Sequence, residues 1–238
     1  MQILTKNQAK YNKATGRGYL NAGITLSPST ESVEFGGRDT CVKSGACGPL
    51  CLRYAGMNQM TTHKAARVKR TLLWVNNPDV FIDLASSEID ALLRKAERKA
   101  MTAAIRPNGL SDEAKLAIRL AKRYPDVQFY DYTKLPKPWT RTLPNYHLTF
   151  SLDIGNEQDA LDALDHGINV AVVFDLGKGD PMPSTWTLNG RTLPVIDGDV
   201  DDLRFLDPVG VFVGLRGKTI TGGRQKGVDA GFYRSLDA

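Results

Sequence analysis

The sequence has 238 residues, with 31 Lys and Arg against 26 Asp and Glu, and a formal net charge of +5. No run approaches the roughly eighteen apolar residues that a membrane-spanning helix needs, and the N-terminus lacks the apolar core of a secretory signal peptide. These features exclude a membrane protein and favour a reducing cytoplasm, where cysteines bind metals more often than they form disulfides.

The positive charge is concentrated near the N-terminus, because residues 1–70 contain eleven Lys and Arg against three acidic residues. Residues 1–18 are polar and basic and predict a flexible N-terminal arm, whereas 19–238 shows no linker and predicts a single domain. A first strand is expected over 19–26. The basic region suits an anionic ligand or nucleic acid, although solvated surface charge explains it equally well.

All three cysteines follow this strand, spaced C-x5-C-x3-C as Cys41, Cys47 and Cys51. Thiolates this close in sequence can converge on one metal centre, and an odd number argues against a self-contained disulfide framework. Three ligands would fill three corners of a cubane 4Fe-4S cluster and leave one iron open for chemistry. Zinc, with His63 as a fourth ligand, and free thiols are the alternatives.

Beyond the cysteines, helices and strands alternate along the chain. Helices are expected over 57–75, 78–98, 111–124 and 156–167, where apolar residues recur at helical spacing. In the first helix, Lys64, Arg67, Lys69 and Arg70 fall on a face that is more often solvated than functional. Strands are expected over 101–106, 127–132, 146–152, 168–174, 192–196 and 209–215, with a loop or small hairpin over 176–191.

This alternation predicts an α/β fold, a partial or irregular parallel (β/α) barrel of six to seven strands with the cysteine loop after strand one. An open doubly wound sheet is the alternative. In either architecture, chemistry belongs at the carboxyl ends of the strands.

Polar residues follow or end most of the predicted strands. Asn108 is assigned to cofactor binding with the three cysteines. Substrate binding or proton transfer is assigned to Arg106, Asp131, Asp153, Asp175, Asp197 and Arg216. Helix caps and turns explain any one of these polar residues, and explain all of them together less easily.

A three-cysteine loop after the first strand of a partial barrel resembles the radical S-adenosylmethionine (SAM) superfamily. The resemblance implies a cluster on Cys41, Cys47 and Cys51 whose open iron binds SAM, in an enzyme acting on a nucleotide or another small anionic substrate. The spacing here differs from the C-x3-C-x2-C of that superfamily, and no Gly-Gly-Glu-like run follows the second strand. Cluster binding tolerates this mismatch better than SAM chemistry does.

A closer resemblance covers most of residues 20–218. It rests on Cys-Gly-Pro-Leu-Cys-Leu-Arg-Tyr-Ala-Gly (47–56), Ala66-Arg67 before Thr71, Ile-Arg-Pro-Asn-Gly-Leu-Ser-Asp (105–112), Tyr-Asp-Tyr-Thr-Lys (130–134), His-Leu-Thr-Phe-Ser-Leu (147–152) and Val-Ile-Asp-Gly-Asp (195–199) with Asp-Leu-Arg-Phe (202–205). In these segments the chain resembles the gene product 88-like proteins of bacteriophages. The resemblance implies a phage or prophage origin and a bacterial host cytoplasm, and it brings no particular activity.

Two classes of function follow from the sequence. The first is an iron–sulfur enzyme that acts on a small anionic substrate, with SAM as a candidate cofactor. The second is a non-catalytic phage protein that binds nucleic acid or a host partner and holds a structural zinc ion. The sequence contains no Walker, GxSxG or HExxH motif, so phosphate-loop, serine-hydrolase and zincin chemistry has no support.

Overall fold

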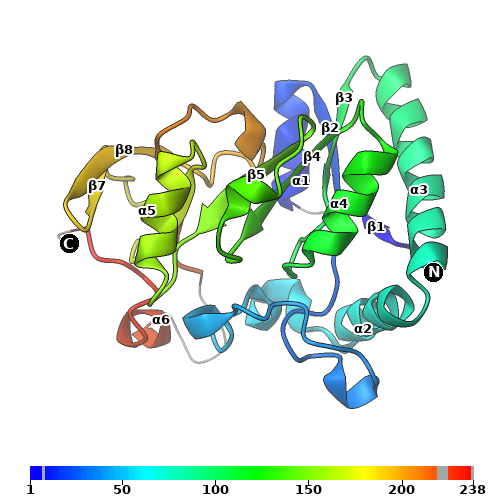
Figure 1. Cartoon of the computed structure of the whole chain (residues 1–238), viewed down its shortest axis with the longest axis horizontal. Helices are drawn as coiled ribbons and strands as arrows, with labels where there is room; N and C mark the ends of the chain where they lie inside the picture. Colours follow the sequence, from blue (N-terminus) through cyan, green and yellow to red (C-terminus); the bar gives the residue numbers. More distant parts are fainter. Residues whose placement is uncertain (7–8, 219–224, 237–238) are drawn as a thin grey trace.

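The computed structural model describes residues 1–6, 9–218 and 225–236. Their strands form one mostly parallel sheet of nine strands in the order β1-β2-β3-β4-β5-β6-β9-β8-β7 (Figure 1). The parallel strands are β2 (Tyr19–Ile24), β3 (Thr102–Arg106), β4 (Gln128–Thr133), β5 (Tyr146–Ser151), β6 (Val170–Phe174), β9 (Phe212–Arg216) and β8 (Arg191–Asp197). These seven match the strands expected from the apolar runs.

The sheet is open, so the predicted barrel is not confirmed. Strands β2 to β6 lie side by side in chain order, as barrel strands would, but the sheet then continues through β9, β8 and β7. The edge strands β1 (Leu4–Thr5) and β7 (Thr185–Leu188) run antiparallel to their single neighbours. In the described structure, β1 and β7 do not pair with each other, so the sheet does not close. The segment 176–191, expected to be a loop or small hairpin, contains β7, which forms a hairpin with the following strand β8.

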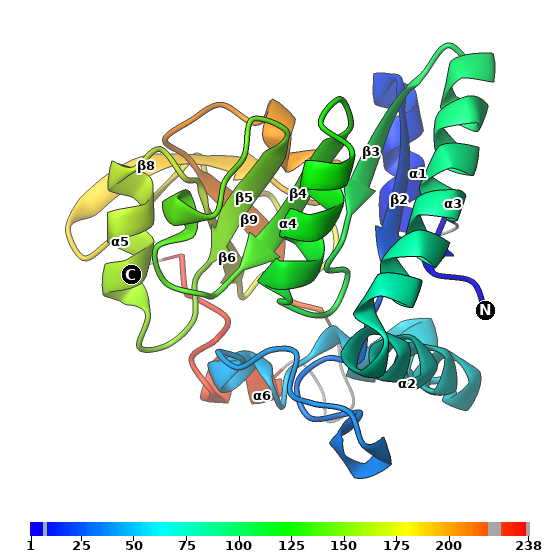
Figure 2. The same ribbon diagram turned by 45° about the vertical axis from the view of Figure 1, so that its right-hand side comes forward.

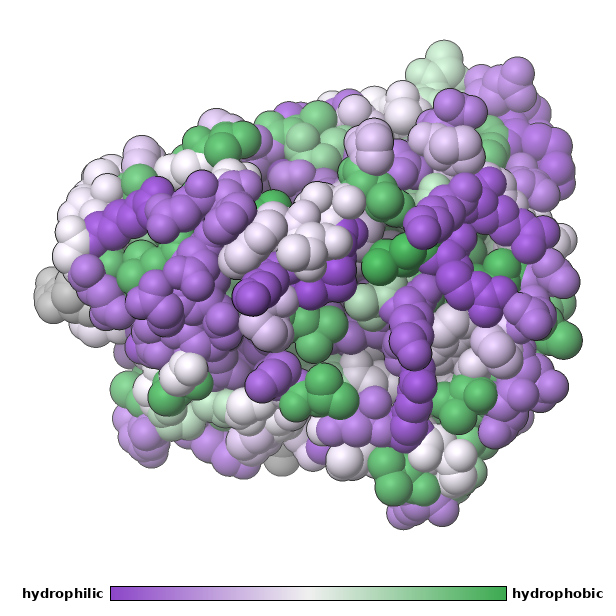
Figure 3. Space-filling view, in the orientation of Figure 1, coloured by the Kyte–Doolittle hydropathy of each residue, from purple (hydrophilic) through white to green (hydrophobic). Residues whose placement is uncertain are grey.

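Helices α3 (Pro78–Arg98), α4 (Ala114–Arg123) and α5 (Glu157–Asp165) cover one face of the sheet (Figure 2). Side chains alternate between the two faces along each strand, so Ala103 and Ile105 pack under α3 and α4 whereas Ala104 faces the other way. The other face is covered by α1 (Ala9–Lys13) and by two short helical turns, η1 (Ala14–Arg17) and η7 (Arg204–Leu206). The outer surface in Figure 3 is mostly hydrophilic, with apolar side chains in small separate groups.

The described part of the N-terminal segment adds a short strand to the sheet. Leu4 and Thr5 pair with β2, and the side chains of Ile3 and Leu4 are fully buried against α3. Glu88 of α3 accepts hydrogen bonds from the backbone amides of both apolar residues, at 2.7 and 2.9 Å. Burial of two large aliphatic side chains in this short strand outweighs the polar character of the segment.

The long segment between β2 and α2 (Thr61–Asn76) lies beyond the carboxyl ends of the parallel strands, together with α6 (Gln225–Asp229) (Figures 1 and 2). This segment contains the cysteine loop, residues 41–51, which follows β2 in the chain. The fold therefore brings the cysteines to the edge of the sheet where parallel α/β proteins place their ligands. Among the described residues, no helix is both long and apolar enough to cross a membrane.

Candidate functional site

A cavity of about 680 Å³ lies between the carboxyl ends of the strands, the cysteine loop and α2, and we call it the cationic cavity. Its lining includes all three cysteines and His63. Among the described residues, two acidic ones, Asp112 and Asp199, line it. Against them stand the basic residues Lys43, Arg67, Arg70, Arg106, Lys134, Arg216 and Lys218. This excess of positive charge favours an anionic occupant.

Short helical turns and side-chain contacts hold the cysteine loop. Cys47 ends the turn η3 (Gly45–Cys47), and its backbone amide donates to the Asp153 carboxylate at 3.4 Å. The Cys41 amide donates to Asp39 at 2.7 Å, and its thiol lies 3.5 Å from the Leu110 carbonyl oxygen. Cys51 is buried at the start of the turn η4 (Leu52–Tyr54). The loop thereby directs three thiols to one cavity.

The thiols are close enough to affect one another's ionisation. Burial, with smaller contributions from the charges of Asp112 and Cys51, raises the pKa of Cys41 to about 12. Burial raises the pKa of Cys51 to about 11, with a contribution of the same sign from Cys47. For Cys47 the pKa is also raised by burial, while the Lys134 ammonium acts in the opposite direction. A metal that binds here must therefore displace thiol protons.

Zinc sites and iron–sulfur clusters place different demands on the spacing of cysteine sulfurs. The described part of the chain contains no group of three or more His, Cys, Asp or Glu side chains placed to hold one metal ion. A tetrahedral zinc site needs its sulfur ligands on one ion, whereas in a cubane cluster each cysteine binds a different iron and the sulfurs stay farther apart. All three cysteines line this cavity, with His63 on the same lining.

Two of the predicted residues, Arg106 and Asn108, line the cavity after β3. The Arg106 guanidinium forms an ion pair with the fully buried Asp202 at 2.8 Å. Asn108 is held by Asp131, which accepts from its backbone amide at 2.8 Å and from its side-chain amide at 2.9 Å. Asn108 also accepts from the Ser111 hydroxyl, so Ser111 does not begin the next helix, which starts at Ala114. Asp131 itself lies behind the wall and positions Asn108.

Asp153 reaches the site through its partners. It is buried, follows β5, and forms an ion pair with Lys134. The Lys134 ammonium lines the cavity and also lies 4.8 Å from the centre of the Phe232 ring. Arg234 donates to the Asp153 carbonyl at 2.9 Å and so ties the C-terminal segment to the same point. Asp153 therefore anchors the Cys47 amide and a cavity cation rather than lining the cavity itself.

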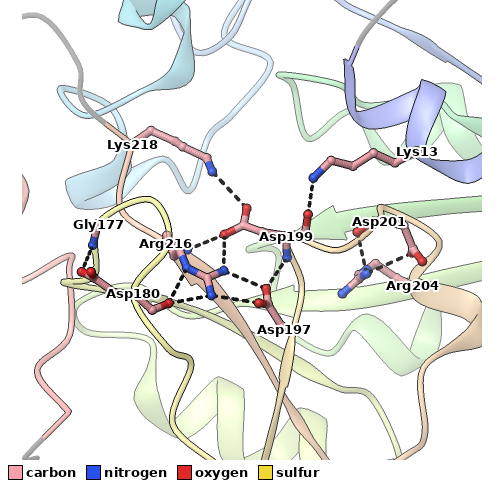
Figure 4. A network of polar contacts seen from close by, with 9 residues as sticks. All are labelled: Lys13, Gly177, Asp180, Asp197, Asp199, Asp201, Arg204, Arg216 and Lys218. Carbon is pink, nitrogen blue, oxygen red and sulfur yellow. Dashed lines mark hydrogen bonds and ion pairs between the residues drawn. The ribbon is translucent and has the colours of Figure 1, made fainter.

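Arg216 lines the cavity, but its guanidinium is fully engaged by neighbouring oxygens (Figure 4). Two nitrogens donate to Asp197, each at 2.9 Å, and one of them also donates to Asp199 at 3.3 Å. The remaining donors reach the Asp180 carbonyl at 2.8 and 3.0 Å. Hydrogen bonding to Asp197 raises the pKa of Arg216 and lowers that of Asp197. The five N–H groups of this side chain thus have protein partners.

Asp175 is the predicted residue that the fold leaves outside the site. It follows β6 as expected, but its side chain is exposed and does not line the cavity. Its backbone amide donates to the Arg234 carbonyl at 2.9 Å, beside an isolated bridge between Phe174 and Arg234. Asp175 belongs to the junction between β6 and the C-terminal segment.

Sequence reasoning missed Lys134 as a site residue and placed Arg67 on a solvated face. Arg67 is buried, with a two-point contact to Glu31 at 2.7 and 2.8 Å, and it lines the cavity with Arg70. Lys134 directly follows Thr133 at the end of β4, so its position at a strand end was the available signal. The pairing of Arg67 depends on the course of a long loop, which no periodic pattern predicts.

Comparison with known proteins gives one match. The family model described as Gene product 88 matches residues 2–235. No curated protein and no solved structure matches the chain.

Proposed function

The chain belongs to the Gene product 88 family, and we propose that it is an iron–sulfur protein whose three cysteines hold a 4Fe-4S cluster. We further propose that the cluster serves an enzyme acting on a small anionic substrate in the cationic cavity. The observation that supports both parts is the shared lining: Cys41, Cys47 and Cys51 face the same cavity as seven basic residues. Three thiolates leave one iron of a cubane cluster without a protein cysteine.

The protein's own residues have separable tasks in this proposal. Asp153 holds the backbone amide of Cys47 and so fixes the middle ligand. Lys134, whose ammonium contacts Asp153, places a positive charge beside the Cys47 thiol, which favours the thiolate form. Asp131 fixes Asn108 at the cavity wall. The cluster would supply one-electron chemistry, or a Lewis-acidic iron, at the edge of the anion-binding space.

The first test is the metal content of the protein purified without oxygen. We expect about four irons per chain with matching sulfide, because three cysteines suit a cubane cluster with one open iron. The variant Cys47→Ala should lose iron and sulfide while its circular dichroism spectrum stays unchanged. Ser44→Ala is the matched control, because Ser44 lines the same cavity from the same loop without a thiol. An intact cluster in Cys47→Ala would refute the proposal.

The same sample separates the competing functions. One zinc per chain without sulfide would favour the non-catalytic binding protein, with His63 as the fourth zinc ligand. DNA binding that weakens with increasing salt would be the second test of that function. Adding SAM to the reduced protein tests the radical-enzyme prediction, since binding at the open iron changes the electron paramagnetic resonance spectrum. A cluster spectrum that does not change when SAM is added would support cluster binding and refute the SAM chemistry.

A further inference from the structure

Three residues that line the cationic cavity each carry a buried polar group that has no hydrogen-bond partner in the part of the chain that the structure describes. These groups are the Thr25 hydroxyl, the Arg106 Nε–H and the Tyr132 hydroxyl. Each of these atoms is buried, and Thr25 as a whole is only 5% exposed. A buried polar group without a partner is costly, on the order of 1–3 kcal/mol, so three on one wall call for an explanation.

Strand register places the three groups together. Gly23 of β2 is paired with Arg106 of β3, and Thr25 lies two residues beyond Gly23, on the same face of the sheet. Tyr132 belongs to β4, the next strand, and its ring lies 4.6 Å from the Arg106 guanidinium carbon. The wall is therefore built by three neighbouring strands at their carboxyl ends.

Gly109 packs closely against this wall. Gly109 lines the cavity next to Thr25, and a Cβ atom at Gly109 would lie only 3.1 Å from the Thr25 hydroxyl oxygen. The following residue, Leu110, provides the carbonyl oxygen that contacts the Cys41 thiol. The three unpartnered groups thus adjoin the cysteine loop within one cavity.

All three groups can donate a hydrogen bond, and Arg106 Nε can only donate. A ligand that satisfies them must offer several acceptor oxygens and tolerate a cationic wall, which describes a carboxylate or a phosphate. Arg70 adds charge here, because it donates to the Thr25 carbonyl at 3.3 Å and has no acidic partner among the described residues. We propose that Thr25, Arg106 and Tyr132 form an oxyanion subsite that holds the anionic group of the substrate beside the cysteine loop.

This inference rests on the proposed function only for the role of the cavity as the working site, and it can be tested without any cluster. The experiment is titration calorimetry of the full chain with inorganic phosphate and, separately, acetate, in chloride buffer of constant ionic strength. Binding of phosphate assigns the subsite to a phosphorylated ligand, and binding of acetate alone assigns it to a carboxylate. The absence of binding by either anion would overturn the proposal.

Two variants identify the subsite. Thr25→Val and Tyr132→Phe should each weaken anion binding about tenfold, the effect of one hydrogen bond to a charged group. Thr149→Val is the matched control: its hydroxyl is also buried without a partner in the described structure, but Thr149 does not line the cavity. Wild-type affinity in both Thr25→Val and Tyr132→Phe would overturn the subsite.

Iron and sulfide content of the same variants separates this proposal from the first. We expect Thr25→Val to retain the cluster while losing anion affinity, because its hydroxyl contacts no cysteine. Full iron content in a wild-type protein that binds neither anion would refute the subsite and leave the cluster proposal standing. Anion binding that depends on Thr25, in a protein without iron, would support the subsite and refute the cluster proposal.

Discussion

The two walls of the cationic cavity use their arginines in opposite ways. On the β9 wall, Arg216 donates all its N–H groups to Asp197, Asp199 and the Asp180 carbonyl. On the wall formed by β2, β3 and β4, Arg106 has one ion-pair partner, Asp202, and a buried Nε–H without a protein acceptor. Both side chains are 14% exposed, so surface exposure alone does not distinguish them.

The difference separates support from recognition. A guanidinium whose donors are all satisfied by protein oxygens gains little from an added anion, and Arg216 thus ties the end of β9 to the end of β8 and to the segment before β7. A guanidinium with a free buried donor beside two free hydroxyls gains a full set of hydrogen bonds when an oxyanion arrives. The number of hydrogen-bond donors without a protein acceptor therefore distinguishes the two walls better than the number of positive charges does.

The largest effect on this contrast between the two walls is expected from Asp202→Asn. Asp202 is fully buried against Arg106, so removing its charge leaves a largely buried cation without compensation. We expect the free energy of unfolding to fall by about 3–5 kcal/mol, measured by denaturant titration of the metal-free chain. Phosphate should bind this variant more tightly than the wild type, because Arg106 is no longer neutralised.

The control for this change is Asp83→Asn. Asp83 pairs with Arg123 on the outer surface, where the side chains are 69% and 48% exposed. An exposed pair of this kind contributes less than about 1 kcal/mol. If the two substitutions destabilised the protein equally, the buried pair would have no special role and the contrast between the two walls would lose its basis.

A smaller effect is expected from the titration of Asp131. Burial raises the pKa of Asp131 to about 7, although Arg106 and the hydrogen bonds from Asn108 and Tyr146 oppose the shift. An unfolded aspartate has a pKa of about 3.9, so between about pH 4 and pH 7 the folded state keeps a proton that the unfolded state releases. Stability should therefore fall as pH rises through this window, by at most about 1.4 kcal/mol per pH unit from this group.

Asp131→Asn isolates that contribution. Burial also raises the pKa of Asp207 to about 6 and lowers that of His147 to about 4, and both titrate within the same window. These groups contribute to both proteins, so the difference between the wild-type and Asp131→Asn stability curves reports Asp131. A difference that stays constant from pH 4 to pH 7 would contradict the raised pKa.

The strands of the central sheet were predictable because their signal is local. Apolar runs such as that of β6 identify a buried strand from its own residues. Closure of the sheet was not predictable, because it depends on which distant strands become neighbours, and β9 pairs with β6 across 37 intervening residues of sequence. The two-residue strand β1 carried no periodic signal, and only its burial under α3 reveals it.

The site was predictable to the level of strand ends. Positions at strand ends correctly predicted that the cysteine loop, Arg106, Asn108 and Arg216 lie at one cavity. They did not reveal that Arg216 is saturated while Arg106 is not, because partners such as Asp180 and Asp202 come from loops far away in the sequence. Thr25 and Tyr132 have no chemical signature of their own, and only their missing partners mark them.

The smallest predicted effect tests the supporting role of Arg216 directly. In Asp197→Asn, the amide oxygen can still accept one hydrogen bond from Arg216, and Asp199 with the Asp180 carbonyl retains the others. We expect a loss of about 1–2 kcal/mol in the free energy of unfolding, because one charge-assisted contact at a partly exposed site disappears. Phosphate affinity should stay within about twofold of the wild type, since the remaining oxygens still occupy the guanidinium donors. A clear gain in phosphate affinity would show instead that Arg216 can exchange its protein partners for the ligand. Both arginines would then bind anions, and the two walls would differ only in how strongly each arginine is bound to its protein partners.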